Sequence, residues 1–272
     1  MLHLLAMAAS LTAQVHRLED SHSYNDALIV LNDAIAKAPT AEAYALRCEV
    51  YVAQGHNASA VSDCEQALKL DPKSGPAYQS LGDAYYNDDD FKSALTNYDS
   101  AVEYKPDADT FWRRCDARRR LDDWSGAASD CEKAAQLAPG APVILLSNAR
   151  IAIHEKNYAK ALTFLDTALA TRPNDVNFLY WHGYSELQLE RFQAAVDDFT
   201  KALGNGDTSA DTYRDRYRAY LGLNKDDLAQ QDWQKAIDLY RAAGQCQTAN
   251  DLTTLGLVEF KINNVKIEIC KP

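Results

Sequence analysis

The sequence predicts an all-α solenoid of about seven stacked helical hairpins. The first observation is an alanine that recurs every 33 or 34 residues, at Ala27, Ala60, Ala94, Ala127, Ala161, Ala195 and Ala229. A second alanine follows each of these seven residues later, at Ala34, Ala67, Ala101, Ala134, Ala168, Ala202 and Ala236. A proline closes five of the repeats at a constant phase, at Pro39, Pro72, Pro106, Pro139 and Pro173. A fixed period of this length is typical of arrays whose repeats stack on their neighbours and bind other proteins.

Each repeat is expected to form a helix, a turn and a second helix. In residues 75–107, Tyr78, Leu81 and Tyr85 recur at helical spacing, and the polar run 87–90 then predicts a turn. The closing proline ends the second helix because it lacks an N–H group and disfavours helical geometry in the residue before it. At the same phase the seven repeats span, approximately, residues 8–40, 41–74, 75–107, 108–141, 142–175, 176–209 and 210–243.

Both ends of the array are expected to be capped, because a repeat buries its apolar face only against its neighbours. Apolar residues near the start recur at helical spacing, at Leu4, Ala8, Leu11, Val15 and Leu18. This spacing favours a first helix over a secretory signal, which would begin with a basic segment. If the protein is exported, we expect its signal to have been removed before this numbering begins. Residues 244–272 are expected to form a capping helix at 245–260 and a tail, in which residues 265–269 alternate as a strand does.

Residues 75–107 also carry a spaced motif of aromatic, Leu-Gly, Tyr, Ala, aromatic, Ala and Pro. Its residues are Tyr78, Leu81, Gly82, Tyr85, Ala94, Tyr98, Ala101 and Pro106. With this motif in phase along nearly the whole chain, the sequence resembles the tetratricopeptide repeat family. The resemblance implies a right-handed superhelix that acts as an interaction scaffold. It also places Gly82 where the two helices of its hairpin cross, opposite Ala94.

Composition and charge disfavour several classes of function. The 272 residues are 47% hydrophobic and carry 39 acidic and 28 basic side chains, for a net charge of −11. Nucleic-acid binding is disfavoured because it needs a basic surface to displace counterions from phosphates. Membrane insertion is not expected because no apolar run is long enough to cross a bilayer. The sequence lacks a Gly-rich phosphate loop, His-Glu-x-x-His and Gly-x-Ser-x-Gly, so we expect no catalytic site and no cofactor.

Four of the six cysteines fall at equivalent places. Cys48 and Cys64 occupy positions 8 and 24 of the second repeat, and Cys115 and Cys131 occupy the same positions of the fourth. In an antiparallel hairpin that turns near position 16, these two positions face each other across the helix crossing. We therefore expect a disulfide within each of these two hairpins.

The other two cysteines, Cys246 and Cys270, flank the C-terminal extension and could join its tail to the last helix. Three disulfides would place the protein in the periplasm or in a secretory compartment. The alternative is a cytosolic scaffold with reduced cysteines, because free cysteine is among the most buried residue types. A zinc site is disfavoured, because the cysteines lack Cys-x-x-Cys spacing and the histidines do not cluster near them.

In the family, the groove is lined mainly by positions 2, 5, 6, 9, 12 and 13 of the first helix. Carried over to this chain, these positions give a candidate peptide-binding set of Arg113, Arg150, Tyr180, Trp181, Tyr184, Arg214 and Arg218. Arginine pairs with carboxylates and aromatic rings bury area at little entropic cost. The expected partner is therefore a protein or an extended peptide with acidic and apolar side chains.

Alternatives to this groove remain open. The arginines of residues 113–120 could instead pair with nearby aspartates, and the aromatic residues could pack against the next helix. The Lys-Asn clamp with which some family members hold a chaperone's C-terminal carboxylate is not supplied by any three consecutive repeats. The chain could also be a co-chaperone or a regulatory module of an enzyme or sensor, and self-association through the terminal faces of the array is possible.

Overall fold

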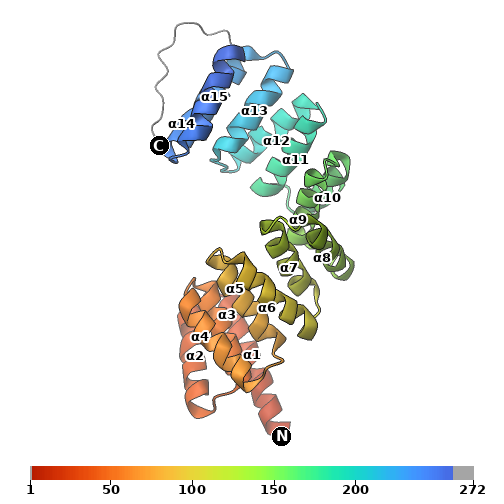
Figure 1. The fold of residues 1–272 in the computed structure, drawn as a ribbon. Coiled ribbons are helices and arrows are strands. Elements are labelled where there is room, and N and C mark those ends of the chain that lie inside the picture. The colour runs from red at the N-terminus through yellow and green to blue at the C-terminus, as the bar shows by residue number, and fades with distance from the viewer. Residues whose placement is uncertain (1, 260–272) are drawn as a thin grey trace. The chain divides into compact units, whose positions relative to one another are not determined.

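A computed structural model describes the backbone of residues 2–259 and the side chains of residues 11–255. Throughout the described backbone the regular elements are α-helices, and consecutive helices pair into hairpins (Figure 1). This confirms the all-α repeat architecture expected from the alanine and proline period. The chain divides into two compact units, which we call unit 1 (Met1–Pro139) and unit 2 (Gly140–Pro272).

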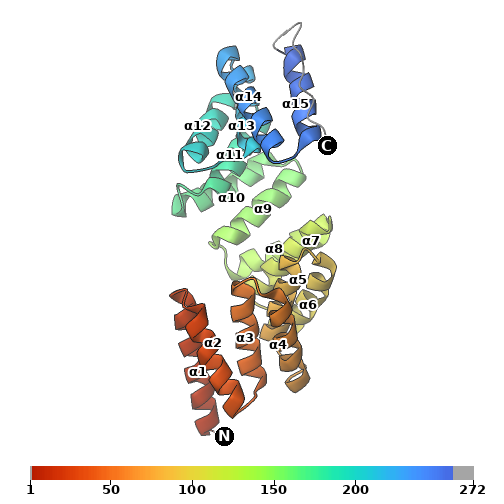
Figure 2. The same ribbon diagram turned by 90° about the vertical axis from the view of Figure 1, so that its left-hand side faces the viewer.

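Unit 1 contains the first four hairpins. Its helices are α1 (Leu2–Asp20), α2 (Tyr24–Lys37), α3 (Ala41–Ala53), α4 (Asn57–Leu70), α5 (Gly75–Asn87), α6 (Phe91–Tyr104), α7 (Ala108–Arg120) and α8 (Trp124–Leu137). Helix α1 packs against α2 and α3, as Figure 2 shows at the red end of the ribbon. Val15 of α1 is fully buried there with Ala27 and Leu31. The first helix therefore covers apolar residues of α2, its partner in the hairpin, and of α3, where Leu46 and Val50 belong to the same cluster.

Unit 2 contains three further hairpins and a last helix. Its helices are α9 (Pro142–His154), α10 (Tyr158–Thr171), α11 (Val176–Gln188), α12 (Phe192–Gly204), α13 (Ala210–Gly222), α14 (Asp226–Ala242) and α15 (Cys246–Glu259). Helix α15 lies where the sequence predicts a capping helix, and it packs on α14. The Trp233 indole N–H donates to the carbonyl oxygen of Leu252 at 2.7 Å, which fixes α15 against α14. The strand expected at 265–269 lies outside the described residues.

Polar side chains begin most of the helices. Thr40 Oγ1 accepts from the N–H of Ala43, and the side chains of Ser74, Asp107 and Asp123 accept in the same way at the starts of α5, α7 and α8. Each of these bonds satisfies an N–H group that has no partner within its own helix. The repeated caps explain why the helix starts keep the period of the sequence.

The turn inside each hairpin places one residue in the left-handed region of backbone space. These residues stand at position 15 of the second to seventh repeats and are Gly55, Asp89, Asp122, Lys156, Glu190 and Asn224. Glycine adopts this conformation without strain, whereas a side chain at a positive φ crowds the backbone. Only Gly55 among these six is therefore free of that cost.

The helices of a hairpin cross where positions 8 and 24 face each other. A Cβ built on Gly82 would lie 2.5 Å from Cε1 of Tyr98, and one on Gly183 would lie 3.0 Å from Cε1 of Phe199. The expectation that Gly82 faces Ala94 is therefore corrected, because the nearest atoms belong to Tyr98. The reason is the register of the hairpin, which places residues 16 apart opposite each other.

The division into two units was not predicted, because residues 139–142 keep the phase of the repeats. This stretch reads Pro139-Gly140-Ala141-Pro142, so two of its four residues have no backbone N–H to donate. A Cβ built on Gly140 would meet no atom within 4 Å.

Candidate functional site

The first helices of the unit 1 hairpins, with Tyr24 of α2 and Tyr98 of α6, line a cleft of about 510 Å³. Its polar wall consists of Glu19, Glu49, Gln79, Ser80, Asp83, Asn87, Arg113 and Asp116. Its apolar wall consists of Tyr24, Val52, Ala53, Tyr86, Tyr98 and Trp112. Four carboxylates and one guanidinium thus face one cavity.

Arg113, the unit 1 member of the candidate set, is paired with aspartates of its own unit. Its Nη1 donates to Asp83 at 2.6 Å and its Nε donates to Asp109 at 3.0 Å. Tyr98 also donates to Asp83, at 2.6 Å. Burial raises the pKa of Asp83, although Arg113 and Tyr98 act in the opposite direction. The guanidinium that was expected to hold an acidic peptide therefore already has two carboxylate partners.

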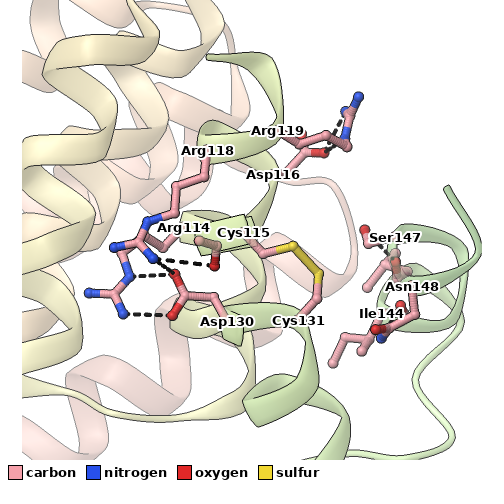
Figure 3. The surroundings of a disulfide bond; sticks show 12 residues. Arg114, Cys115, Asp116, Arg118, Arg119, Asp130, Cys131, Ile144, Ser147 and Asn148 are labelled. Carbon is pink, nitrogen blue, oxygen red and sulfur yellow. Dashed lines mark hydrogen bonds and ion pairs between the residues drawn. A yellow bond between two sulfur atoms is a disulfide. The ribbon is translucent and has the colours of Figure 1, made fainter. Parts of the chain in front are cut away.

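Two neighbours of Arg113 pair with a buried carboxylate on α8. Arg114 donates through Nε and Nη2 to the two oxygens of Asp130, at 2.8 and 2.7 Å, and Arg118 lies 3.1 Å from the same group (Figure 3). Asp130 is only 1% exposed. Arg119 donates to Asp116 at 2.6 Å. These contacts match the alternative in which the arginine run serves the structure of its own unit.

The pair Arg114–Asp130 belongs to a series that the sequence analysis missed. In four repeats a basic residue at position 7 bonds to an aspartate at position 23, in Arg47–Asp63, Arg114–Asp130, His182–Asp198 and Arg216–Asp232. The two residues of each pair are 16 positions apart, as are the two cysteines of each bridge. The register that predicts the bridges therefore also predicts these pairs. Each pair joins the two helices of one hairpin.

The same crossings hold the cysteines. Cys48 is bonded to Cys64 and Cys115 to Cys131, with Cα–Cα distances of 5.5 Å in both bridges. All four residues are fully buried. Each bridge lies within a single hairpin and closes a separation of 16 residues. Cys246 begins α15, and Cys270 lies outside the described residues.

In unit 2, three aromatic residues of the candidate set form one cluster on α11. The ring centroids of Tyr180 and Trp181 are 5.1 Å apart, and those of Trp181 and Tyr184 are 5.8 Å apart. The Arg150 guanidinium of α9 lies 5.0 Å from the centre of the Trp181 ring. All three rings are half-buried, so each presents part of its surface to solvent. The structure thus brings Arg150, Tyr180, Trp181 and Tyr184 together.

The remaining two candidates meet at a buried aspartate of α13. Asp215 is 0% exposed and accepts hydrogen bonds from Arg214 at 3.0 and 3.1 Å and from Tyr180 at 3.0 Å. Arg218 lies 3.5 Å from Asp215 and keeps 48% of its side chain exposed. Arg214 also bonds to Asp211. Burial opposes the charge on Arg214, but Asp215 and Asp211 together raise its pKa. Asp215 therefore orients Tyr180, Arg214 and Arg218 on one face.

His182 is held between two carboxylates. Its Nδ1 lies 2.7 Å from Asp198 and its Nε2 lies 3.1 Å from Asp166. Burial opposes protonation, but the bonds to Asp198 and Asp166 raise the pKa of the imidazole above its usual value of 6.5. A general base needs one ring nitrogen directed at a nucleophile or a substrate. Both nitrogens of His182 are taken, so the arrangement is suited to packing rather than to proton transfer.

A group that could hold a metal ion stands at the edge of the unit 1 cleft. Ligand atoms of His16, Glu19 and Glu49 lie within 4.8 Å of one another. Burial, followed by the charges of Glu49 and Asp20, raises the pKa of Glu19 to about 7. The spacing of these residues in the sequence does not reveal the group, because it depends on how α1 packs against α3.

None of the helices in the described part of the chain combines the length and the apolar character that a membrane crossing requires. Three family models, each described as a tetratricopeptide repeat, match residues 41–74, 80–142 and 119–180. These matches cover the repeats around the cysteine-containing hairpins and extend into α11.

Known proteins share this pattern over part of their length. The chain is 32% identical over 103 residues to small glutamine-rich tetratricopeptide repeat-containing protein 2 of Mycosarcoma maydis, covering 38% of this chain and 29% of that protein. It is 29% identical over 100 residues to a DnaJ homolog subfamily C member 3 homolog of Dictyostelium discoideum, covering 35% of this chain and 20% of that protein. The chain therefore matches less than a third of the length of either relative.

A solved structure shows the same fold. The hetero-tetramer Cut9–Hcn1 of the APC/C contains a chain that superposes with a TM-score of 0.77 at 17% identity. The match covers 89% of this chain and 48% of that one. At this level of identity the likeness establishes the architecture and leaves the ligand to be argued from the residues themselves.

Proposed function

Because the chain belongs to the tetratricopeptide repeat family, we propose that it is a non-catalytic adaptor that binds a protein or an extended peptide. The observation that carries this proposal is the cluster on unit 2, where the half-buried rings of Tyr180, Trp181 and Tyr184 lie beside Arg150. Aromatic and arginine side chains dominate the affinity of most protein interfaces. We call this cluster, together with Arg214 and Arg218, the aromatic face.

The chemistry of the aromatic face favours a partner with apolar and acidic side chains. An apolar side chain can cover Trp181 and Tyr184, and a carboxylate can pair with the exposed guanidinium of Arg218. Asp215 holds Arg214 and Tyr180 in place before the partner arrives, which lowers the entropic cost of binding. Arg113 is left out of this site, because Asp83 and Asp109 already occupy its donors.

The two bridges within hairpins support an exported form of the adaptor, either periplasmic or secreted. Disulfides persist in oxidising compartments and are rare in the cytosol. Counting free thiols on denatured, never-reduced protein from its native source tests this proposal. Bridges mapped to 48–64, 115–131 and 246–270 would support export, whereas six free thiols would contradict it.

The second candidate is a cytosolic scaffold or co-chaperone with reduced cysteines. The likeness to a relative named as a DnaJ homologue favours it. Buried cysteine packs as a small apolar residue even when it is reduced. The same thiol count separates the two candidates, since their compartments predict opposite results.

The binding proposal is tested with peptides selected from a random library on the full-length chain. Affinity of the selected peptides would be measured by fluorescence anisotropy. We expect Trp181→Ala to weaken binding about 30-fold or more, and Arg218→Ala to weaken it about 5- to 10-fold. Arg172→Ala is the matched control, because Arg172 is an exposed arginine of unit 2 at the end of α10. Arg218→Ala changes an exposed side chain, so it also tests the face without disturbing the fold.

Two results would contradict the aromatic face as the binding site. One is a selected peptide whose affinity stays within about twofold of wild type in both variants. The other is a peptide that loses as much affinity with Arg172→Ala as with Arg218→Ala. Circular dichroism of Trp181→Ala would establish that its helices remain folded.

A further inference from the structure

The carboxylates of the unit 1 cleft fall into two classes. Asp83 accepts hydrogen bonds from Arg113 and Tyr98, and Asp116 accepts them from Arg119. These two acidic groups are therefore compensated by charge or by hydrogen bonding within unit 1. They shape the floor of the cleft and have little charge left for a ligand.

Glu19 and Glu49 form the second class. Glu19 extends from α1 and Glu49 from α3, and their carboxylate oxygens lie within 4.8 Å of each other. No lysine or arginine among the described residues forms an ion pair with either group. The ring of His16 offers the third ligand atom that lies within 4.8 Å of both carboxylates.

The cleft beside this pair is partly apolar. Tyr24, Val52 and Ala53 line the same cavity of about 510 Å³. Lysine and arginine bury their methylene stems on apolar surface while their charged groups reach a polar partner. The apolar wall can therefore contact the methylene stem of a lysine or arginine, and the two carboxylates can contact its charged group. A metal ion would use the carboxylates and leave the apolar wall without a role.

We propose that the unit 1 cleft binds a lysine or arginine side chain of a protein partner, with its charged group between Glu19 and Glu49. This proposal rests on the adaptor function above and adds a second contact of opposite charge to that of the aromatic face. Two carboxylate oxygens that flank one ammonium group with hydrogen bonds of ~2.8 Å are separated by ~4.6 Å. The ligand atoms of Glu19 and Glu49 lie within 4.8 Å of each other, a limit that includes this separation.

The experiment uses two pentapeptides, acetyl-Ala-Leu-Lys-Leu-Ala-amide and the same peptide with norleucine in place of lysine. Each is titrated into the ¹⁵N-labelled full-length chain, and the amide signals of residues 19, 49 and 52 are followed by NMR. The variants are Glu19→Gln and Glu49→Gln, which keep the size of the side chain. Glu65→Gln is the control, because Glu65 is an exposed glutamate of α4 in the same unit and does not line the cleft.

We expect the lysine peptide to bind at least about fivefold more tightly than the norleucine peptide. Each cleft variant should weaken the lysine peptide by about 3- to 10-fold and leave the norleucine peptide unchanged. Glu65→Gln should change neither. Equal affinity for the two peptides, or a lysine effect that Glu19→Gln and Glu49→Gln leave intact, would overturn the proposal.

A zinc titration separates a side chain from a metal ion. If Zn²⁺ saturates the signals of His16, Glu19 and Glu49 and the lysine peptide fails to compete for them, the cleft is a metal site and the proposal is wrong. Trp181→Ala and Arg218→Ala should bind the lysine peptide as wild type does. Failure of the aromatic face would therefore be distinguishable from failure of this cleft.

Discussion

The hairpin α7–α8 of unit 1 and the hairpin α11–α12 of unit 2 close the same helix crossing by different chemistry. Unit 1 joins Cys115 to Cys131 with a covalent bond. Unit 2 places the ring of Phe199 in the space that Gly183 leaves open. Both solutions stand at positions 8 and 24, so the backbone register is shared and only the side chains differ. The fold of the repeat therefore tolerates either a bond or a packed ring at its centre.

The ion pair next to each crossing differs as well. Arg114 keeps its charge at any physiological pH, because a guanidinium does not lose its proton there. The corresponding pair in unit 2 is His182 with Asp198, whose cation exists only while the imidazole is protonated. The comparison teaches that oxidation state acts on the α7–α8 hairpin and that pH acts on the α11–α12 hairpin. Four experiments test this difference between the two hairpins.

Phe199→Ala should remove the ring that fills the helix crossing of the α11–α12 hairpin. Phe199 is fully buried, and truncation of such a ring costs about 3–5 kcal/mol because a cavity remains. Hydrogen exchange followed by mass spectrometry should show lost protection in residues 176–209 and unchanged protection in residues 108–141. Phe164→Ala is the control, since the Phe164 ring of α10 is only half-buried and should cost less. Equal losses in both hairpins would contradict the separate roles of the two crossings.

The double variant Cys115→Ala with Cys131→Ala should weaken the α7–α8 hairpin. A bridge over 16 residues contributes about 3 kcal/mol on the chain-entropy model. Hydrogen exchange of the variant under oxidising conditions should show less protection in residues 108–141 than oxidised wild-type protein has. Adding reductant should bring wild-type protein to the same level and leave residues 176–209 unchanged. If reductant changed the α11–α12 hairpin to the same extent, the assignment of redox sensitivity to unit 1 would be wrong.

His182→Arg should remove a pH dependence from unit 2. The folded pKa of His182 is raised above the unfolded value of about 6.5 by Asp198 and Asp166, after burial has acted in the opposite direction. The stabilisation is therefore complete below the unfolded pKa and is lost as pH rises through the folded pKa. Urea unfolding from pH 6 to pH 9 should show a wild-type midpoint that falls relative to that of the variant. Parallel curves for the two proteins would show that His182 contributes no such dependence.

Glu190→Gly should stabilise unit 2 slightly. Glu190 has a φ of 59°, and replacing a residue that carries a side chain by glycine in this conformation gains about 0.5–1 kcal/mol. Gly55→Ala, at the equivalent turn of unit 1, should cost about the same amount, since Gly55 has a φ of 73°. Urea midpoints of the two variants should therefore move in opposite directions. Movement in the same direction would exclude backbone strain as the cause.

Much of the fold could be predicted because the recurring residues either pack between helices or end them. The proline that closes residues 75–107 follows α6, and the polar run 87–90 contains the turn between α5 and α6. The place of the turn, near position 16 of the repeat, also predicts that positions 8 and 24 lie opposite each other. The unit boundary at 139–140 could not be predicted, because Pro139 and Gly140 are in phase with the other repeats.

The candidate sites were predicted less completely. The residues of the aromatic face stand at groove positions that the family resemblance implies, so the sequence was sufficient to propose them. The role of Asp215 depends on side chains from neighbouring hairpins meeting at one buried atom. The pair Glu19 and Glu49 depends on how α1 packs against α3. Contacts of this kind follow from three-dimensional geometry and leave no periodic signal.

The placement of each bridge within one hairpin has a consequence for biosynthesis. Cys48 and Cys64 are consecutive cysteines in the chain, and so are Cys115 and Cys131. Of the three ways to pair these four thiols, the observed one joins each cysteine to its nearest neighbour in sequence. A nascent chain could therefore oxidise each hairpin as it emerges, with its correct partner already present and no later thiol required. A protein built this way has little need of isomerases to sort its disulfides.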